Sequence, residues 1–208
     1  MGTTIVTYTG KIFDYSNIQP SMICIEDIAH SLALTNRYNG MTRYPYSVAE
    51  HCVRMALCDE LPGHPLAKLL HDAAEAYIGD IVKPFKVGLH YLEPGFEENE
   101  RYYYQIETIE HEIQNAILKA FDIKLKIDNH SEAADWMWLN SPEVKQSDRA
   151  ILAEECTALM PSDEISKKEL GKWLVGVTPA NTGLTHWNVY PWQKAKTLYY
   201  NTFKELTK

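Results

Sequence analysis

The chain of 208 residues carries a formal net charge of −8, with 45% hydrophobic and 23% charged residues. This composition is ordinary for a globular protein, and the length suits one domain with its own core. The acidic balance argues against broad electrostatic binding of nucleic acid or of an anionic membrane.

The first part of the chain predicts a short β segment followed by helices. Residues 1–16 lack the basic and apolar order of a secretory leader, and no apolar run approaches the roughly 20 residues that span a bilayer, so a cytoplasmic location is expected. β-branched and aromatic residues over 4–13 predict a hairpin or an extended arm. Residues 25–34 form an amphipathic pattern, and Ser47 then opens a helix with the capping box Ser47-x-x-Glu50.

The middle and last parts of the chain are also helical in pattern. Pro65 suits the first position of a helix that runs to about Tyr77, with Gly79 as its stop. The segment after it is expected to be irregular because of Pro84. Periodic apolar residues predict further helices over about 97–121, 131–139, 142–160 and 191–206.

These patterns predict an all-α fold with a short N-terminal β hairpin or arm. The whole chain, 1–208, is expected to form one domain with its core at about 25–160. The C-terminal helix, at about 191–206, is expected either to pack on that core or to lie at a subunit interface.

The stretch LLHDAAEAYIGD, residues 69–80, places charged groups on an otherwise apolar helix. His71, Asp72 and Glu75 are three or four residues apart, so they can share one side of it. Burying unpaired carboxylates costs on the order of several kcal/mol. A divalent cation removes this penalty, because the imidazole and the carboxylate become its ligands.

Two more ligands are expected from elsewhere in the chain. His51 lies in the apolar stripe of the preceding helix, and a helical hairpin can bring it to His71 and Asp72. Asp148 is the preferred fourth ligand, because it lies on the inward face of a well-defined helix. Asp135 is the alternative.

The order of these residues resembles that of the HD-domain phosphohydrolases, an all-helical family that binds a divalent metal. The string HDAAEAYIGDIVKPFK, residues 71–86, is similar to the branch of bacterial 5'-deoxynucleotidases and phage dATP triphosphohydrolases. The resemblance covers about residues 25–160 and extends faintly to the last helix.

The resemblance also implies roles for residues outside the ligand set. Glu75 and Asp80 correspond to catalytic acid/base carboxylates. Arg37 corresponds to a residue that grips phosphate, and Lys86 to a lysine near phosphate. Tyr38 stands where the nucleotidases typically have Trp, so it can limit the sugar or the base of the substrate.

Some alternatives remain open for these roles. Arg43 is a rival of Arg37, and Lys83 is a rival of Lys86. A set of two histidines and two aspartates suits one divalent transition metal, namely Mn, Co, Fe, Ni or Zn, and leaves coordination positions open. A second metal such as Mg can accompany a triphosphate substrate.

The resemblance therefore implies an enzyme, a metal-dependent phosphohydrolase of deoxynucleotides in which water attacks phosphorus. It acts either as a dNMP 5'-nucleotidase or as a dNTP (dATP) triphosphohydrolase. Its expected partners are a small-molecule nucleotide and further copies of itself in a homo-oligomer, with no stable nucleic-acid binding and no membrane. The alternatives are a metal-dependent phosphodiesterase and a catalytically inactive nucleotide-sensing HD protein.

Overall fold

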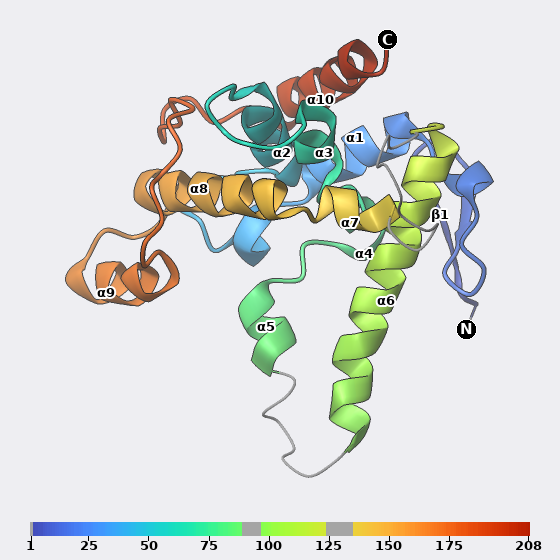
Figure 1. The fold of residues 1–208 in the computed structure, drawn as a ribbon, viewed down its shortest axis with the longest axis horizontal. Coiled ribbons are helices and arrows are strands. Elements are labelled where there is room, and N and C mark those ends of the chain that lie inside the picture. The colour runs from blue at the N-terminus through green and yellow to red at the C-terminus, as the bar shows by residue number, and fades with distance from the viewer. Residues whose placement is uncertain (1, 89–96, 124–134) are drawn as a thin grey trace.

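The computed structural model describes residues 2–88, 97–123 and 135–208; the side chains of residues 97–105, 135 and 136 lie outside this description. Within these ranges the protein is mostly helical, with a two-stranded antiparallel hairpin near the N-terminus (Figure 1). This confirms the expected fold class, all-α with a short N-terminal hairpin.

The hairpin pairs β1 (Thr4–Val6) with β2 (Ile12–Asp14). Its inward side chain is Phe13, which is fully buried and stacks on Tyr77 with ring centroids 4.3 Å apart. The hairpin is thereby attached to the segment that leads directly to Asp80.

Three helices from distant parts of the sequence form the centre of the core. They are α1 (Ile25–Leu34), α2 (Val48–Leu57) and α10 (Trp192–Leu206), and α10 packs against both of the others. The expected N-cap of α2 is present, because Ser47 Oγ accepts a hydrogen bond from the Glu50 amide at 3.2 Å.

The C-terminal helix α10 takes one of the two placements expected for it, packed on the core. Tyr199 is fully buried, and its hydroxyl donates to the Leu69 carbonyl at 3.0 Å. The preceding helix, α9 (Glu164–Trp173), lies at the far end of the molecule (Figure 1). None of the helices in the described ranges is long and apolar enough to cross a membrane.

The helix expected to run unbroken from Pro65 to Tyr77 is divided, so that prediction was wrong. The structure has α3 (Pro65–Leu70), a turn over 71–74 and α4 (Glu75–Ile78). In and directly after this turn, amides bond to the carbonyl three residues back, as in Ala73 N to Leu70 O at 2.9 Å and Glu75 N to Asp72 O at 3.0 Å. This tighter winding brings side chains three residues apart into line.

The segment around Pro84 is helical rather than irregular, which also corrects a prediction. It forms α5 (Lys83–Gly88), where proline occupies the first turn and its missing N–H is not needed. The remaining helices are α6 (Glu97–Ala120), α7 (Asp135–Leu139) and α8 (Pro142–Leu159). Two short 3-10 helices, η1 (Pro20–Met22) and η2 (Arg37–Gly40), lie before α1 and α2.

Candidate metal centre

Two imidazole rings face each other where α2 packs against α3. His51 lies on α2 and is fully buried, and His71 directly follows α3 with only 8% of its surface exposed. Their Nε2 atoms are 3.3 Å apart. The helical pair therefore brings together two histidines that are 20 residues apart in the sequence.

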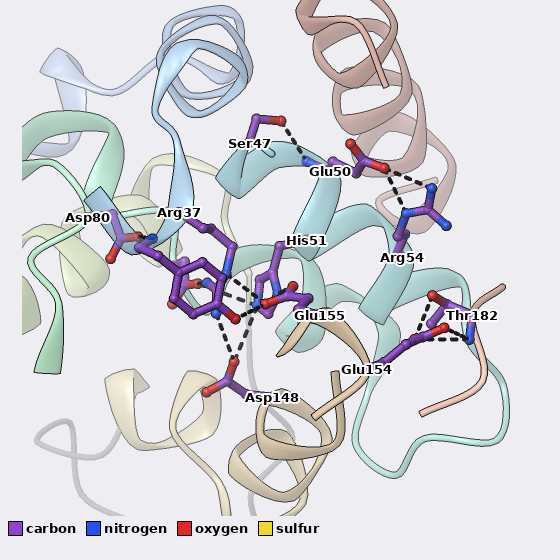
Figure 2. Close-up of polar contacts among 12 residues, drawn as sticks. Arg37, Ser47, Glu50, His51, Arg54, Asp80, Asp148, Glu154, Glu155 and Thr182 are labelled. Atoms are coloured by element: carbon purple, nitrogen blue, oxygen red, sulfur yellow. Dashed lines mark hydrogen bonds and ion pairs between the residues drawn. The ribbon is translucent and has the colours of Figure 1, made fainter. Parts of the chain in front are cut away.

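Two carboxylates also converge on these nitrogens, one from the residue that follows His71 and one from α8. Asp72 Oδ2 lies 3.1 Å from His71 Nε2 and 3.6 Å from His51 Nε2. Asp148 Oδ1, on α8, lies 3.3 Å from His51 Nε2 and 3.9 Å from His71 Nε2 (Figure 2). The structure thus brings all four predicted ligands together, and the side chain of the alternative, Asp135, lies outside the described residues.

The spacing of these atoms suits a metal ion. Ligand atoms that each lie about 2.0–2.2 Å from one metal are about 3–3.5 Å from one another. The Nε2–Nε2 and Nε2–carboxylate separations in this cluster run from 3.1 to 3.9 Å. The buried group of His51, His71 and Asp72 can therefore hold a metal ion.

The hydrogen bonds of the two histidines also suit metal binding. His51 Nδ1 lies 2.6 Å from Glu155 Oε1, and His71 Nδ1 lies 2.8 Å from the Lys68 carbonyl oxygen. An ionised carboxylate and a carbonyl only accept, so each Nδ1 carries a proton. In the neutral ring the lone pair is then on Nε2, which faces the cluster, as in metal-binding histidines.

Among the protein groups, charge pairing holds the cluster together. Burial alone would lower the pKa of His71, but the adjacent Asp72 carboxylate raises it well above its ordinary 6.5. Burial likewise acts to raise the pKa of Asp72, yet His71 holds it below 3.8. The cluster thus favours an anionic aspartate that is matched by positive charge.

Arg37 supplies a further positive charge directly against this cluster. Its guanidinium lies 3.1 Å from Asp72, 3.7 Å from Asp148 and 3.2 Å from Glu155. The Arg37 side chain is 11% exposed. The residue predicted to grip phosphate therefore borders the predicted metal ligands.

The backbone after Arg37 adopts an unusual conformation. Tyr38 and Asn39 have φ values of +58° and +53°. These lie in the left-handed region, which is energetically unfavourable for residues other than glycine. Two contacts hold Tyr38 there: its amide donates to Asp80 Oδ2 at 3.0 Å, and its hydroxyl donates to Glu155 Oε2. The predicted aromatic residue is thus tied to the edge of the cluster.

The two predicted catalytic carboxylates lie beside the ligands. Burial, followed by Asp72 and Asp80, raises the pKa of Glu75 well above 4.5. Glu75 Oε2 is buried and has no hydrogen-bond partner among the described residues. Burial also raises the pKa of Asp80. Gly79, which directly precedes Asp80, has a φ of +79° and forms the turn that brings Asp80 to the Tyr38 amide.

The remaining predicted basic residues lie away from the cluster. Lys86 Nζ is paired with Glu110 of α6 at 3.0 Å. Its rival Lys83 is exposed at the start of α5. Arg43 donates to the Ser162 hydroxyl at 3.3 Å on an exposed site. Of the basic candidates, the structure brings only Arg37 to the ligands, and the phosphate role of Lys86 stays a prediction.

Glu155 is a member of the site that the sequence reasoning missed. It is fully buried on α8, and its carboxylate accepts hydrogen bonds from His51, Arg37 and Tyr38. The available signal was its place seven residues, or two helical turns, after Asp148, which puts both acids on one face of α8.

The comparisons with known proteins leave the function open. No family model matches the chain. Uncharacterized protein RCAP_rcc00048 of Rhodobacter capsulatus is 44% identical over 98 residues, which cover 41% of this chain and 48% of the relative. Uncharacterized protein YfdR of Escherichia coli is 44% identical over 84 residues, which cover 39% of this chain and 46% of the relative. The matched part spans about half the length of these curated relatives.

Proposed function

We propose that the protein is a metal-dependent phosphohydrolase of deoxynucleotides. The observation that carries the proposal is a guanidinium placed against a set of two imidazoles and two carboxylates with metal-ligand spacing. A phosphate group is recognised by the same combination, because a cation and a planar guanidinium fork both pair with its oxygens.

The residues that would hold the metal are His51, His71, Asp72 and Asp148. Two nitrogen and two oxygen donors suit a divalent transition metal such as Mn, Co, Fe, Ni or Zn. The Asp148 side chain is 39% exposed, so this edge of the cluster opens to solvent. Such a metal supplies Lewis acidity, which lowers the pKa of water and polarises the phosphoryl group.

The protein's own carboxylates would manage the protons. In the hydrolysis, a water oxygen forms a bond to phosphorus and the ester or anhydride P–O bond breaks. One proton must leave the water, and one must reach the departing oxygen. Glu75, whose pKa is raised, suits the donor role, and Asp80 suits the acceptor role.

Arg37 would bind the phosphate. It now pairs with Asp72 and Asp148, and a metal that neutralises these carboxylates would free its fork for phosphate oxygens. Tyr38 would form a wall beside the substrate, since its backbone is tied to Asp80 and its hydroxyl to Glu155. The deoxynucleotide class and the choice between mono- and triphosphate rest on the resemblance of residues 71–86 to HD-domain enzymes.

The test is product analysis on metal-reloaded protein. Metal-stripped protein is reloaded with Mn²⁺ or Co²⁺ and offered dNMPs, dNTPs and their ribonucleotide counterparts, with products separated by chromatography. Asp72→Asn removes a ligand and is expected to abolish turnover. Asp59→Asn makes the same change at an exposed position on the α2–α3 turn and is the matched control.

Each outcome assigns the substrate or rejects the proposal. Phosphate released from dNMPs alone indicates a 5'-deoxynucleotidase. Release of triphosphate from a dNTP, above all from dATP, indicates a triphosphohydrolase. If metal binds but none of these compounds is hydrolysed, the proposal fails. The alternatives to test are then a phosphodiesterase and a nucleotide sensor.

A further inference from the structure

Both oxygens of the buried Glu155 carboxylate accept hydrogen bonds from other side chains. Oε1 faces His51 Nδ1 at 2.6 Å, while Oε2 accepts from Arg37 Nε at 3.2 Å and from the Tyr38 hydroxyl (Figure 2). These three partners lie more than 100 residues from Glu155 in the sequence. A buried carboxylate is costly unless it is fully paired, and this one is.

The partners of Glu155 belong to two different parts of the candidate site. His51 is a metal ligand, whereas Arg37 and Tyr38 lie on the substrate side. The other histidine is anchored differently, because His71 Nδ1 meets the main-chain carbonyl of Lys68 at 2.8 Å. Of the two histidine anchors, therefore, the one at His51 is the one that also contacts Arg37 and Tyr38.

We infer that Glu155 is a positioning residue with two linked tasks. One oxygen holds His51 in the tautomer and orientation that present Nε2 to the metal. The other oxygen sets the places of Arg37 and Tyr38 for a phosphate-bearing substrate. The second task rests on the proposed function, and the first does not require turnover.

Replacing this carboxylate by an amide distinguishes the inference from simple packing. In Glu155→Gln, an amide oxygen turned to His51 places the NH₂ group against Arg37 Nε–H, which only donates. An NH₂ group turned to His51 instead favours the ring tautomer with its proton on Nε2, directed into the metal site. The second orientation keeps the amide oxygen as acceptor for both Arg37 and Tyr38 and is therefore the one expected. It loses the His51 anchor, and a lost anchor of this kind lowers metal affinity about 10- to 100-fold.

Glu154→Gln is the matched control. It makes the same change on the next residue of α8, but the Glu154 carboxylate accepts from the amides of Thr182 and Leu184, at 2.9 and 3.0 Å. These contacts hold a loop that lies apart from His51 (Figure 2). Its loss is expected to lower stability without changing metal affinity.

The experiment measures Mn²⁺ affinity by calorimetry for the wild type and both variants. Ring-nitrogen NMR of the metal-free proteins, on the alkaline side of the histidine titrations, reports the tautomers. We expect E155Q to bind Mn²⁺ about 10- to 100-fold more weakly and to change the tautomer signal of His51 but not of His71. At saturating Mn²⁺, E155Q should also bind inorganic phosphate more weakly than E154Q does.

The inference is overturned if E155Q binds Mn²⁺ as tightly as E154Q and leaves the His51 signal unchanged. Glu155→Asp is the second variant, for the case that E155Q does not fold. It keeps an acceptor but shortens its reach, so weaker Mn²⁺ binding with the native tautomer is expected, and affinity equal to that of E154Q refutes the inference. Wild-type protein that binds Mn²⁺ without hydrolysing any nucleotide removes the proposed function and leaves the His51 task standing.

Discussion

Replacing Arg37 by Met tests whether one guanidinium balances the charge of the cluster. The substitution keeps a linear apolar stem but removes the positive charge that lies 3.1 to 3.7 Å from three carboxylates. In metal-free protein, the two histidines would then be the remaining partners of opposite charge that the described residues offer to Asp72, Asp148 and Glu155. We expect a large loss of stability that a divalent metal restores in part.

The structure sets the size of that loss. Removing one partner of a buried ion pair costs about 3–5 kcal/mol. The lower end applies here, because Glu155 keeps its contact with His51 and the Asp148 side chain is 39% exposed. For a domain of this size, about 3 kcal/mol corresponds to a fall in Tm of about 6–12 °C.

Thermal unfolding in chelator and in excess Mn²⁺ measures both effects. We expect R37M to unfold about 6–12 °C below the wild type in chelator, and Mn²⁺ to raise the variant's Tm more than that of the wild type. Arg43→Met removes an exposed guanidinium and should change stability by less than about 0.5 kcal/mol. An R37M variant as stable as the wild type in chelator, or a Tm gap that Mn²⁺ leaves unchanged, would refute the reasoning.

Three further predictions follow from the site and the core. Asp148→Asn should weaken Mn²⁺ binding in calorimetry while leaving the circular dichroism spectrum unchanged; undiminished affinity would exclude Asp148 as a ligand. Burial and the adjacent carboxylates raise the pKa of Glu75, so its contribution to metal-free stability is complete below its ordinary 4.5 and is lost as the pH rises through the raised pKa. Glu75→Gln should therefore be more stable than the wild type above that pKa and show less pH dependence in urea unfolding; identical pH profiles would contradict this. Tyr199→Phe leaves the Leu69 carbonyl without its hydroxyl donor and should cost about 1–3 kcal/mol in urea unfolding, with Mn²⁺ affinity unchanged.

Local features of the fold could be read from the sequence because short-range contacts produce them. The caps at Ser47 and Ser141 act on amides three residues ahead, so the local sequence determines where α2 and α8 start. The same holds for the apolar stripes that predicted α6 and α10. Pro84 shows the limit of such rules, because it breaks a helix interior but is accepted in a first turn.

The candidate ligands could also be found in the sequence, because a charged group on the apolar face of a helix is costly to bury unless it has a partner. His51, His71 and Asp72 stood out in this way, and Asp148 followed from the inward face of its helix. The division between α3 and α4 could not be predicted. The spacing of apolar residues does not show whether an amide bonds to the carbonyl three residues back or to the one four residues back.

The tertiary structure alone decided which groups serve the same site. Glu155 looks like an ordinary helix glutamate in the sequence, and its partners His51 and Arg37 lie 104 and 118 residues away. In the sequence Arg43 remained an alternative to Arg37, and the structure places only Arg37, of these two, against the predicted ligands. Periodicity determines which face of a helix turns inward, whereas the contacts between buried faces arise only when the helices pack together.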